Sequence, residues 1–454
     1  MVGGLVAWPQ LCGAETMESA LVQAYQNNPQ LNAQRASARA TDEAVPQALS
    51  GYRPRVSITT TLGEQYTDIT TKATSAGINT FQRNHGTTTP YTGGGTVTQT
   101  LFNGFQTANR TRVAESQVSA AREGLRVMEQ TVLLAAATSY MDVLRDTANL
   151  EVQRTNVRVL EETLKQTRDR FNVGEVTRTD VAQAEAQLAA GQSAVATAES
   201  TLNTSRAAYR QIIGVEPVNL APGSLVDRFS PRVLSAAIDS GLTENPNVTA
   251  AMYGIDVAHL QVKINEGALF PNVSLQGNIQ YASFPQLSIV HQYTAGVVGQ
   301  VTVPIYQGGG EFSLIRQSKE TLGQQRLNLD QVRNQARQAV VQAWGQLQAA
   351  KAQIIAAQSQ VASSEVALNG VREEARVGQR TTLDVLNAQQ ALVNARIALV
   401  VAQHDRVVAS YNLLAAVGRL SPQVLGLPTS VYDPMVHYQQ VRDAWFGIRI
   451  LDGR

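Results

Sequence analysis

Apolar residues recur every seven positions along the second half of the chain. One row comprises Val340, Leu347, Ile354, Val361, Leu368 and Ala375. A second row, four positions earlier, comprises Ala336, Ala343, Ala350 and Ala357. Two apolar rows at heptad spacing are typical of helices that pack along a narrow seam, and alanine in one row lets the backbones approach closely. The pattern predicts a coiled-coil helix through 311–381, a range without proline.

The first of these rows also occurs in the first half of the chain, shifted by 204 residues. There it reads Ala136, Val143, Leu150, Val157, Leu164 and Phe171. Three pairs of glycines share the shift: Gly104 and Gly308, Gly174 and Gly378, and Gly214 and Gly418. The motif V-G-x-x-T-x-x-D-V starts at Val173 and again at Val377. A repeat this long exceeds any solenoid unit, so the chain is interpreted as two tandem structural repeats.

Each long helix is expected to end at a glycine and to be followed by a shorter helix. Thr177 and Thr381 are suitable N-cap residues, and Asp180 and Asp384 stand three positions after them. The predicted helices cover 17–50, 105–177, 177–214, 231–267, 311–381 and 381–418. The half-length helices are expected to stack end to end beside the full-length ones, which predicts a cylinder of antiparallel coiled coils.

Upstream of each long helix, apolar and polar residues alternate with a period of two. In the second copy the apolar positions include Val273, Leu275, Ile279 and Tyr281, with Ser, Gln and Asn between them. Each copy therefore predicts one β-hairpin, at 52–102 and at 271–304, with 63–90 and 283–292 as connecting loops. Uncharged segments of about ten residues that are apolar on one face suit a membrane β-barrel with a wet lumen. A soluble β-sandwich would alternate in the same way.

Two hairpins supply four strands, which are too few to close a barrel. Open strand edges are not tolerated in lipid, because their backbone N–H and C=O groups would have no partners. If these strands enter a membrane, several chains must pool them. Three chains give twelve strands, an even number within the range of outer-membrane barrels.

Composition narrows the function classes. The 454 residues carry a formal net charge of +1, which gives no support for nucleic acid as a partner. No run of about 18 apolar residues occurs, so no transmembrane helix is expected. The short apolar stretch 1–14, with small residues at Cys12 and Ala14, fits the remnant of a signal peptide, and a disordered apolar terminus is the alternative.

The sequence predicts the following division of the chain. Residues 1–14 are the signal-peptide remnant, 15–214 the first repeat, 215–230 a linker, 231–420 the second repeat, and 421–454 a C-terminal tail that packs around the helices.

No catalytic or metal-binding motif is present. The five histidines are scattered without a His-x-x-x-His pair, and neither a G-x-S-x-G nor a P-loop occurs. No enzyme activity, cofactor or metal is therefore predicted. A periplasmic adaptor or another coiled-coil scaffold would explain the seams, but it would not explain two amphipathic hairpins at equivalent places in two repeats.

Several short motifs resemble the TolC-like outer membrane efflux proteins, also called outer membrane factors. These are Arg-Phe-Asn-Val-Gly at 170–174 with Thr-Asp-Val at 179–181, Pro-Ile-Tyr-Gln-Gly-Gly at 304–309, Val-Gly at 377–378, Arg-Thr at 380–381 and Asp-Val-Leu at 384–386. The resemblance covers nearly everything from Glu15 to about Leu420.

The resemblance implies a mixed α and β fold. Three chains would form a twelve-stranded β-barrel in outer-membrane lipid of a Gram-negative bacterium, four strands per chain, continuous with a long α-helical coiled-coil barrel in the periplasm. Such homotrimers export drugs or secreted polypeptides. They are docked through a periplasmic adaptor to an inner-membrane RND or ABC transporter and use no cofactor.

By the same resemblance, the lower helix turns form a gate. Residues matching Asp180 and Arg380 join neighbouring coils and hold the tunnel shut, with Phe171 packing nearby, and Asp384 contributes to an acidic constriction ring. Two positions depart from the family pattern, because Ala375 replaces the gate tyrosine and Asn387 replaces a second ring aspartate. The local interpretation is that each aspartate lies in the first turn of a helix, where its carboxylate complements the helix macrodipole, and this does not exclude a gate role.

The resemblance also implies an adaptor contact at the two turns. The residues concerned are Val173, Gly174, Val377, Gly378 and Thr381. In any fold, the two glycines would also be suitable helix C-caps.

Overall fold

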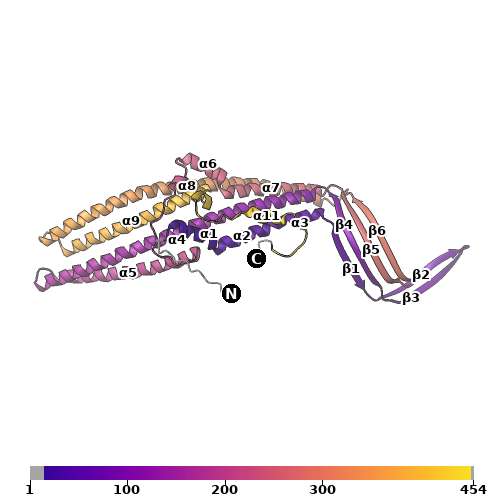
Figure 1. Ribbon diagram of the computed structural model, residues 1–454, viewed down its shortest axis with the longest axis horizontal. Coiled ribbons are helices and arrows are strands. Elements are labelled where there is room, and N and C mark those ends of the chain that lie inside the picture. The colour runs from indigo at the N-terminus through magenta and orange to yellow at the C-terminus, as the bar shows by residue number, and fades with distance from the viewer. Residues whose placement is uncertain (1–14, 451–454) are drawn as a thin grey trace, which may run out of the picture. The chain divides into compact units, whose positions relative to one another are not determined.

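A computed structural model describes residues 15–450 of the chain, and the predicted signal remnant 1–14 lies outside them (Figure 1). The first copy contains α1 (Met17–Asn27), α2 (Pro29–Asp42), α3 (Ala44–Leu49), η1 (Ser50–Tyr52), β1 (Arg55–Leu62), β2 (Gln65–Ser75), β3 (Ile78–Thr88), β4 (Tyr91–Asn103), α4 (Gln106–Asn172) and α5 (Arg178–Ile213). After η2 (Asp227–Phe229), the second copy contains α6 (Leu234–Glu244), α7 (Pro246–Gly267), β5 (Asn272–Gln286), β6 (Ile289–Thr302), α8 (Gly310–Arg376) and α9 (Thr382–Val417).

The two copies have matching helices. Both α4 and α8 have 67 residues, and both α5 and α9 have 36, so the predicted long and short helices are confirmed. All four alanines of the second seam row are buried, as are Val340, Leu347 and Leu368 of the first row. The seam therefore does pack as the heptad pattern predicts.

The predicted continuous helices at 17–50 and 231–267 are each broken at an Asn-Pro pair. The Asn28 side-chain oxygen accepts hydrogen bonds from the backbone N–H of Gln30 and Leu31, which caps α2, and Pro29 occupies the first helical turn. Asn28 also donates to the Ile212 carbonyl at 3.0 Å, and Asn245 donates likewise to Ala416 at 3.1 Å. The break thus ties each helix pair to the end of α5 or α9.

Compact packing divides the chain into two units. Within the described residues, unit 1 comprises 15–37, 122–250 and 329–433, and unit 2 comprises 38–121, 251–328 and 434–450. Each unit contains residues of both sequence copies. The boundary between the units therefore does not coincide with the predicted linker at 215–230. That division stays a prediction about the sequence repeats.

Unit 1 contains two helical hairpins, α4 with α5 and α8 with α9 (Figure 1). Ion pairs link the members of each hairpin, as between Arg168 and Glu185 at 2.6 Å and between Arg396 and Glu365 at 2.7 Å. Its largest apolar cluster joins residues of α1, α4, α5 and α9. Within it the buried Tyr140 hydroxyl donates to the backbone carbonyls of Glu15 and Ala221, which satisfies its one polar group.

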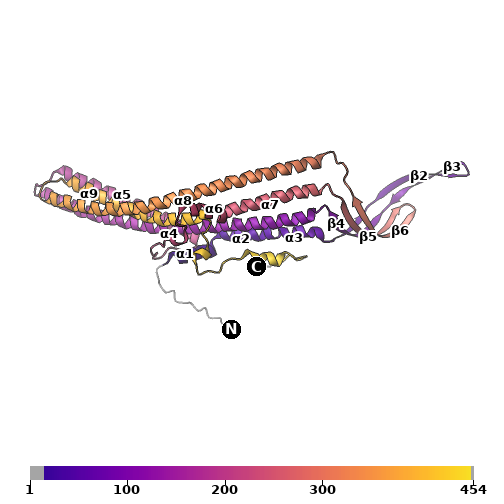
Figure 2. The ribbon, with the colours of Figure 1, turned by 90° about the horizontal axis from the view of Figure 1, so that it is seen from above.

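In unit 2, α7 runs beside α8 (Figure 2). Lys319 and Glu266 form an ion pair between these helices at 3.0 Å, and Ala258, Val262 and Leu322 share a small buried cluster. The tail beyond Leu420 forms α10 (Pro422–Leu425) and α11 (Pro434–Val441). In unit 2, α11 places His437 Nδ1 3.0 Å from a buried Asp42 oxygen.

The sheet of unit 2 has four antiparallel strands in the order β1-β4-β5-β6, so the two predicted hairpins lie in one sheet. The prediction of 63–90 as a loop is wrong, because β2 and β3 pair there through a two-residue turn at Ala76 and Gly77. Both turn residues have positive φ, as a tight hairpin turn requires, and the many β-branched threonines favour strand. Residues 283–292 are also mostly strand, since β5 extends to Gln286 and β6 begins at Ile289.

The register places most of the apolar residues of the four strands on one face. Val56 pairs with Val97, Ile279 with Ala295, and Tyr281 with Tyr293, and directly paired residues point to the same side. The other face carries Ser57, Thr96, Asn278 and other uncharged polar residues. Both faces are open to solvent in the single chain: Ile58 and Val297 on the apolar face are 83% and 73% exposed, and Val298 on the other face is 57% exposed. The sheet is therefore not packed on the core of its own chain.

Among the described residues, α9 meets the length and mean hydropathy expected of a membrane-crossing helix, which the sequence analysis did not anticipate. A third of its most apolar window is buried inside the chain. Residues near its C-terminal end, including Leu413 and Leu414, belong to the helical core clusters of unit 1. Core packing accounts for these apolar residues.

A polar cluster around the buried His404 links α4 to α9 in unit 1. His404 Nε2 lies 3.0 Å from Asp142 Oδ1, and its Nδ1 lies 2.8 Å from Asp405 Oδ1. Arg145 also pairs with Asp142 at 2.8 Å. Burial by itself lowers the pKa of His404, but the two carboxylates outweigh it and raise that pKa above its ordinary value.

A pH-dependent contribution to stability follows. Because the folded-state pKa of His404 is raised, the contribution is complete below the unfolded value of about 6.5 and is lost as pH rises through the folded-state pKa. We expect His404→Gln to cost about 1 kcal/mol more at pH 6 than at pH 9. Thermal unfolding followed by circular dichroism at both pH values measures this, and an equal cost at both would contradict the assignment.

A second stability prediction compares two glycines at equivalent positions. Gly104 and Gly308 both have positive φ, so alanine at either should cost about 1 to 2 kcal/mol. A Cβ on Gly104 would also overlap the Gly267 carbonyl, whereas a Cβ on Gly308 meets no atom within 4 Å. Gly104→Ala should therefore lower the unfolding temperature more than Gly308→Ala does. Equal shifts in unfolding temperature would show that the backbone around Gly104 and Gly267 moves apart without loss of stability.

Candidate functional site

Two turns of nearly identical geometry join α4 to α5 and α8 to α9. In each, a glycine has a φ of +79°, and the next N–H bonds a carbonyl five residues back, Glu175 to Arg170 and Gln379 to Glu374, both at 2.9 Å. This pattern satisfies the last carbonyls of the long helix and permits a sharp turn. An added Cβ would meet no atom within 4 Å at Gly174 or Gly378. The glycines are therefore required by backbone conformation, and their turns are open surface.

Each short helix begins with a capping box. Thr177 accepts from the Asp180 N–H at 3.3 Å, and Asp180 Oδ2 accepts from the Thr177 N–H at 2.9 Å. Thr381 and Asp384 repeat this arrangement at 3.2 and 3.0 Å. The local interpretation of both aspartates is therefore confirmed.

These hydrogen bonds also lower the pKa of both carboxylates. The Thr177 side chain, followed by its backbone N–H, holds the pKa of Asp180 below its usual range. At Asp384, the backbone N–H and then the hydroxyl of Thr381 lower the pKa, with a smaller contribution from Arg380. Both residues therefore carry negative charge at neutral pH.

Arg380 lies at the second turn but is bound within its own hairpin. Its Nε donates to Glu374 Oε2 at 2.8 Å. Among the described residues of one chain, no ion pair or hydrogen bond joins Arg380 to Asp180. The predicted Asp180–Arg380 contact therefore stays a prediction. Glu374 is a partner that the sequence analysis missed.

The remaining predicted site residues divide by exposure. Val173 and Val377 are each 71% exposed, and Thr381 and Asn387 are also exposed, so these side chains are accessible at the turns. Phe171 is 42% exposed, whereas Ala375 is buried at the end of its seam row. Accordingly, Phe171 has apolar surface that its own chain leaves uncovered.

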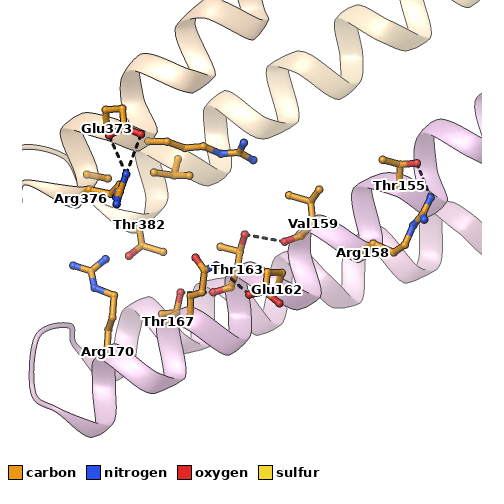
Figure 3. A pocket seen from close by; sticks show the side chains of 14 residues that line it. Thr155, Arg158, Val159, Glu162, Thr163, Thr167, Arg170, Glu373, Arg376 and Thr382 are labelled. Carbon is orange, nitrogen blue, oxygen red and sulfur yellow. Dashed lines mark hydrogen bonds and ion pairs between the residues drawn. The ribbon is translucent and has the colours of Figure 1, made fainter.

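A groove of about 880 Å³ lies between the two hairpins of unit 1, near the turns (Figure 3). It is lined by Thr155, Arg158, Val159, Glu162, Thr163, Gln166, Thr167, Arg170, Arg372, Glu373, Ala375, Arg376, Thr382 and Val385. Only Ala375 of these was a predicted site residue. The signal in the sequence was the four-residue spacing of Arg158, Glu162, Gln166 and Arg170, which places them on one helix face.

The described residues contain no group of three or more His, Cys, Asp or Glu side chains that could hold a metal ion. The turns expose valines and capped helix ends, and the groove is lined by arginines. Apolar and positively charged side chains of this kind can bind the surface of another protein.

Comparison with known proteins agrees with this arrangement. The family model described as "Outer membrane efflux protein" matches residues 20–215 and 237–419. The outer membrane efflux protein BepC of Brucella suis is 41% identical over the full chain and 96% of its own length. The outer membrane protein TolC of Vibrio cholerae is 28% identical, covering 90% of this chain and 92% of its own.

Solved structures show the same fold at low sequence identity. The Campylobacter jejuni CmeC outer membrane channel has a TM-score of 0.78 at 16% identity, covering 94% of this chain and 89% of its own. The Vibrio cholerae outer membrane protein VceC has a TM-score of 0.74 at 19% identity, covering 88% and 96%. With its paired helical repeats and its open four-stranded sheet, the chain belongs to the outer membrane efflux protein family and is an outer-membrane exit duct for efflux or type I secretion, with a helical tunnel in the periplasm.

Proposed function

We propose that three copies of the chain assemble into a homotrimer whose sheets join into a twelve-stranded β-barrel. The observation that carries this proposal is the open sheet, in which β1 and β6 each have one neighbouring strand among the described residues. In lipid, the unpaired edges of β1 and β6 need partner strands from other chains. The apolar face would meet lipid, and the Ser, Thr, Asn and Gln face would line the lumen.

We further propose that the trimer receives its cargo from an inner-membrane RND or ABC transporter through a periplasmic adaptor. Relatives support both export routes, since they include the alkaline protease secretion protein AprF of Pseudomonas aeruginosa and the cation efflux system protein CusC of Escherichia coli. The exposed Val173 and Val377 and the open glycine turns are the surface proposed to meet the adaptor.

The gate is proposed to lie at the same turns. Arg380 of one chain would pair with Asp180 of a neighbouring coil, and Asp384 from three chains would form one acidic ring. Asp180 and Asp384 are held ionised by their capping boxes, which suits both roles. With Asn387 in place of a second aspartate and Ala375 in place of a tyrosine, closure would depend mainly on the Arg380 contact.

A test of the barrel compares two neighbouring valines of β6. Val297 lies on the apolar face opposite Gly277, and Val298 lies on the polar face opposite Gln276. Val297→Arg should cost about 2 to 4 kcal/mol if that face meets lipid near the bilayer centre, whereas Val298→Arg in the lumen should be tolerated. The measurement is the yield of heat-labile trimers of each variant in isolated outer membranes. Equal trimer yields from the two variants would contradict the lipid-facing assignment.

A test of the gate uses Arg380→Ser in planar lipid bilayers. Loss of the guanidinium should raise single-channel conductance several-fold, because the contact between chains at the constriction would be removed. Arg178→Ser is the matched control, since Arg178 is an exposed arginine at the first turn without a gate role. Unchanged conductance in Arg380→Ser would reject this assignment while leaving the duct itself in place.

A further inference from the structure

Residues 445–450, the apolar tail, follow α11 and carry apolar side chains that the chain itself leaves uncovered. Four of these six residues are apolar, and all four are exposed: Trp445, Phe446, Ile448 and Ile450. Phe446 is 96% exposed, so no other part of the described chain covers it. Exposed apolar surface is unfavourable in water in proportion to its area, and a contiguous group of such side chains marks a surface that contacts something apolar.

The start of the apolar tail is held in a defined place within unit 2. Tyr438 of α11 packs on an apolar cluster that α3 and α4 share. After α11, Arg53 Nη1 donates a hydrogen bond to the Ala444 carbonyl oxygen at 2.6 Å. The Arg53 guanidinium carbon also lies 4.7 Å from the centre of the Trp445 ring, within the range of a cation–π contact. Specific contacts therefore fix the position of Trp445, although its ring stays exposed.

That position is the helix-side end of the four-stranded sheet. Arg53 lies between η1 and β1, two residues before the strand begins. Figure 1 shows α11 beside α3, the last α-helix before β1. The apolar tail therefore starts where the helices of unit 2 lead into strands.

Exposed aromatic side chains flank the same end of all four strands. One lies within four residues of the helix-side end of each strand: Tyr52 before β1, Phe105 after β4, Phe270 before β5 and Tyr306 after β6. Membrane-spanning barrels carry girdles of aromatic residues at headgroup level, next to their apolar band. The composition of this end of the sheet is therefore that of a membrane interface, and Trp445 lies at the same level.

The chemistry of the apolar tail favours phospholipid as its surroundings. The proposed lumen face of the sheet carries uncharged polar side chains, and a water-filled lumen would leave Phe446 and Ile448 in water. The tail also contains the exposed Arg449, and Asp443 is the one acidic residue of 442–450. Aromatic and aliphatic side chains next to an arginine match a leaflet in which acyl chains adjoin phosphates.

We propose that the apolar tail is a further membrane contact of the chain, which inserts Trp445, Phe446 and Ile448 into the periplasmic phospholipid leaflet beside the barrel. Arg53 holds the Trp445 ring at headgroup level, and Arg449 binds lipid phosphates. Because α11 ties the tail to α3 and α4, this contact fixes the height of unit 2 in the membrane. The inference rests on the proposed function, since the sheet must span the membrane for its helix-side end to meet that leaflet.

The test measures the fluorescence of Trp445 in the full chain, reconstituted in phospholipid vesicles. The substitutions Trp8→Phe and Trp344→Phe leave Trp445 as the one tryptophan. Bromine atoms near the headgroup end of the acyl chains quench a tryptophan that inserts among them. Brominated vesicles should lower Trp445 emission about twofold relative to unbrominated vesicles, because interfacial side chains lie about 5 to 10 Å into the boundary between headgroups and acyl chains.

Two matched reporters separate the apolar tail from the barrel. Trp8→Phe with Trp445→Phe leaves Trp344 of α8, which packs on a helical core cluster of unit 1 and should not be quenched by bromine. Tyr293→Trp, in a chain whose three native tryptophans are replaced by Phe, reports on the apolar face of β6. It should be quenched, because that face is proposed to meet lipid.

A further comparison tests insertion of the tail itself. Phe446→Asp with Ile448→Asp should return Trp445 emission to its level in unbrominated vesicles, because charged side chains oppose entry into the acyl region. Val436→Asp is the control, since Val436 is an exposed valine of α11 outside the tail, and it should leave the quenching unchanged. Circular dichroism checks that both variants keep their helices.

An equal loss of quenching in Val436→Asp would overturn the inference, and so would a Trp445 that aqueous acrylamide quenches and lipid bromine does not. Quenching of Tyr293→Trp without quenching of Trp445 would reject the tail contact and leave the barrel in place. Quenching of Trp445 without quenching of Tyr293→Trp would reject the barrel and leave the tail contact. Quenching of neither would reject both.

Discussion

The architecture depends on backbone hydrogen bonds that a single chain cannot complete. The four-stranded sheet leaves one edge of β1 and one edge of β6 without partners among the described residues, and it presents a face of Val, Ile, Leu and Tyr to the surroundings. In water, such a sheet would expose both apolar surface and pairing-competent edges, which favours aggregation. In a membrane, the apolar face is solvated by lipid, and the edges are satisfied only when neighbouring chains supply strands. In the proposed homotrimer, assembly would therefore be part of how this chain folds.

The two sequence copies share the residues that shape the helices and turns, and they differ at several charged residues. Both copies contain the glycine turns and the capping boxes. Both also contain an asparagine, Asn28 or Asn245, that donates a hydrogen bond to the end of α5 or α9 at nearly the same distance. These are the features that hold long helices at close spacing. Arg158 and Arg170 of α4 and the cluster around His404 occur in one copy only, since Ala362, Glu374 and Ser200 stand at the equivalent positions. Features that both copies share thus maintain the fold.

Much of the fold could be predicted from the sequence because its signals are local. Heptad spacing predicts the helices, glycine and threonine predict the turns between them, and the alternation of apolar and polar residues predicts the two faces of the strands. The break at Asn28 could not be predicted from periodicity, because the heptad signal continues across a residue whose side chain bonds the distant Ile212 carbonyl. Composition does not distinguish the paired strands β2 and β3 from a loop, because threonine, glycine and asparagine occur both in loops and in exposed strands.

The site was harder to predict than the fold, because it depends on which helix faces meet. Arg158 and Arg372 are far apart in the sequence, and only the packing of the two hairpins brings them to one groove. The partner of Arg380 depends on distance: Glu374 is six residues away on the same hairpin, whereas Asp180 is on the other hairpin. Contacts between chains can be predicted neither from the hydrophobic periodicity of the sequence nor from the structure of a single chain.

The most direct measurement of the central claim is disulfide cross-linking between the two sheet edges. One cysteine replaces Thr59 on β1, a second is moved residue by residue along β6, and Cys12 is replaced by serine. If β1 of one chain pairs with β6 of the next, one register should give a covalent ladder that ends at three chains in the outer-membrane fraction. Cross-links only within single chains, or a ladder that continues past three, would contradict the account.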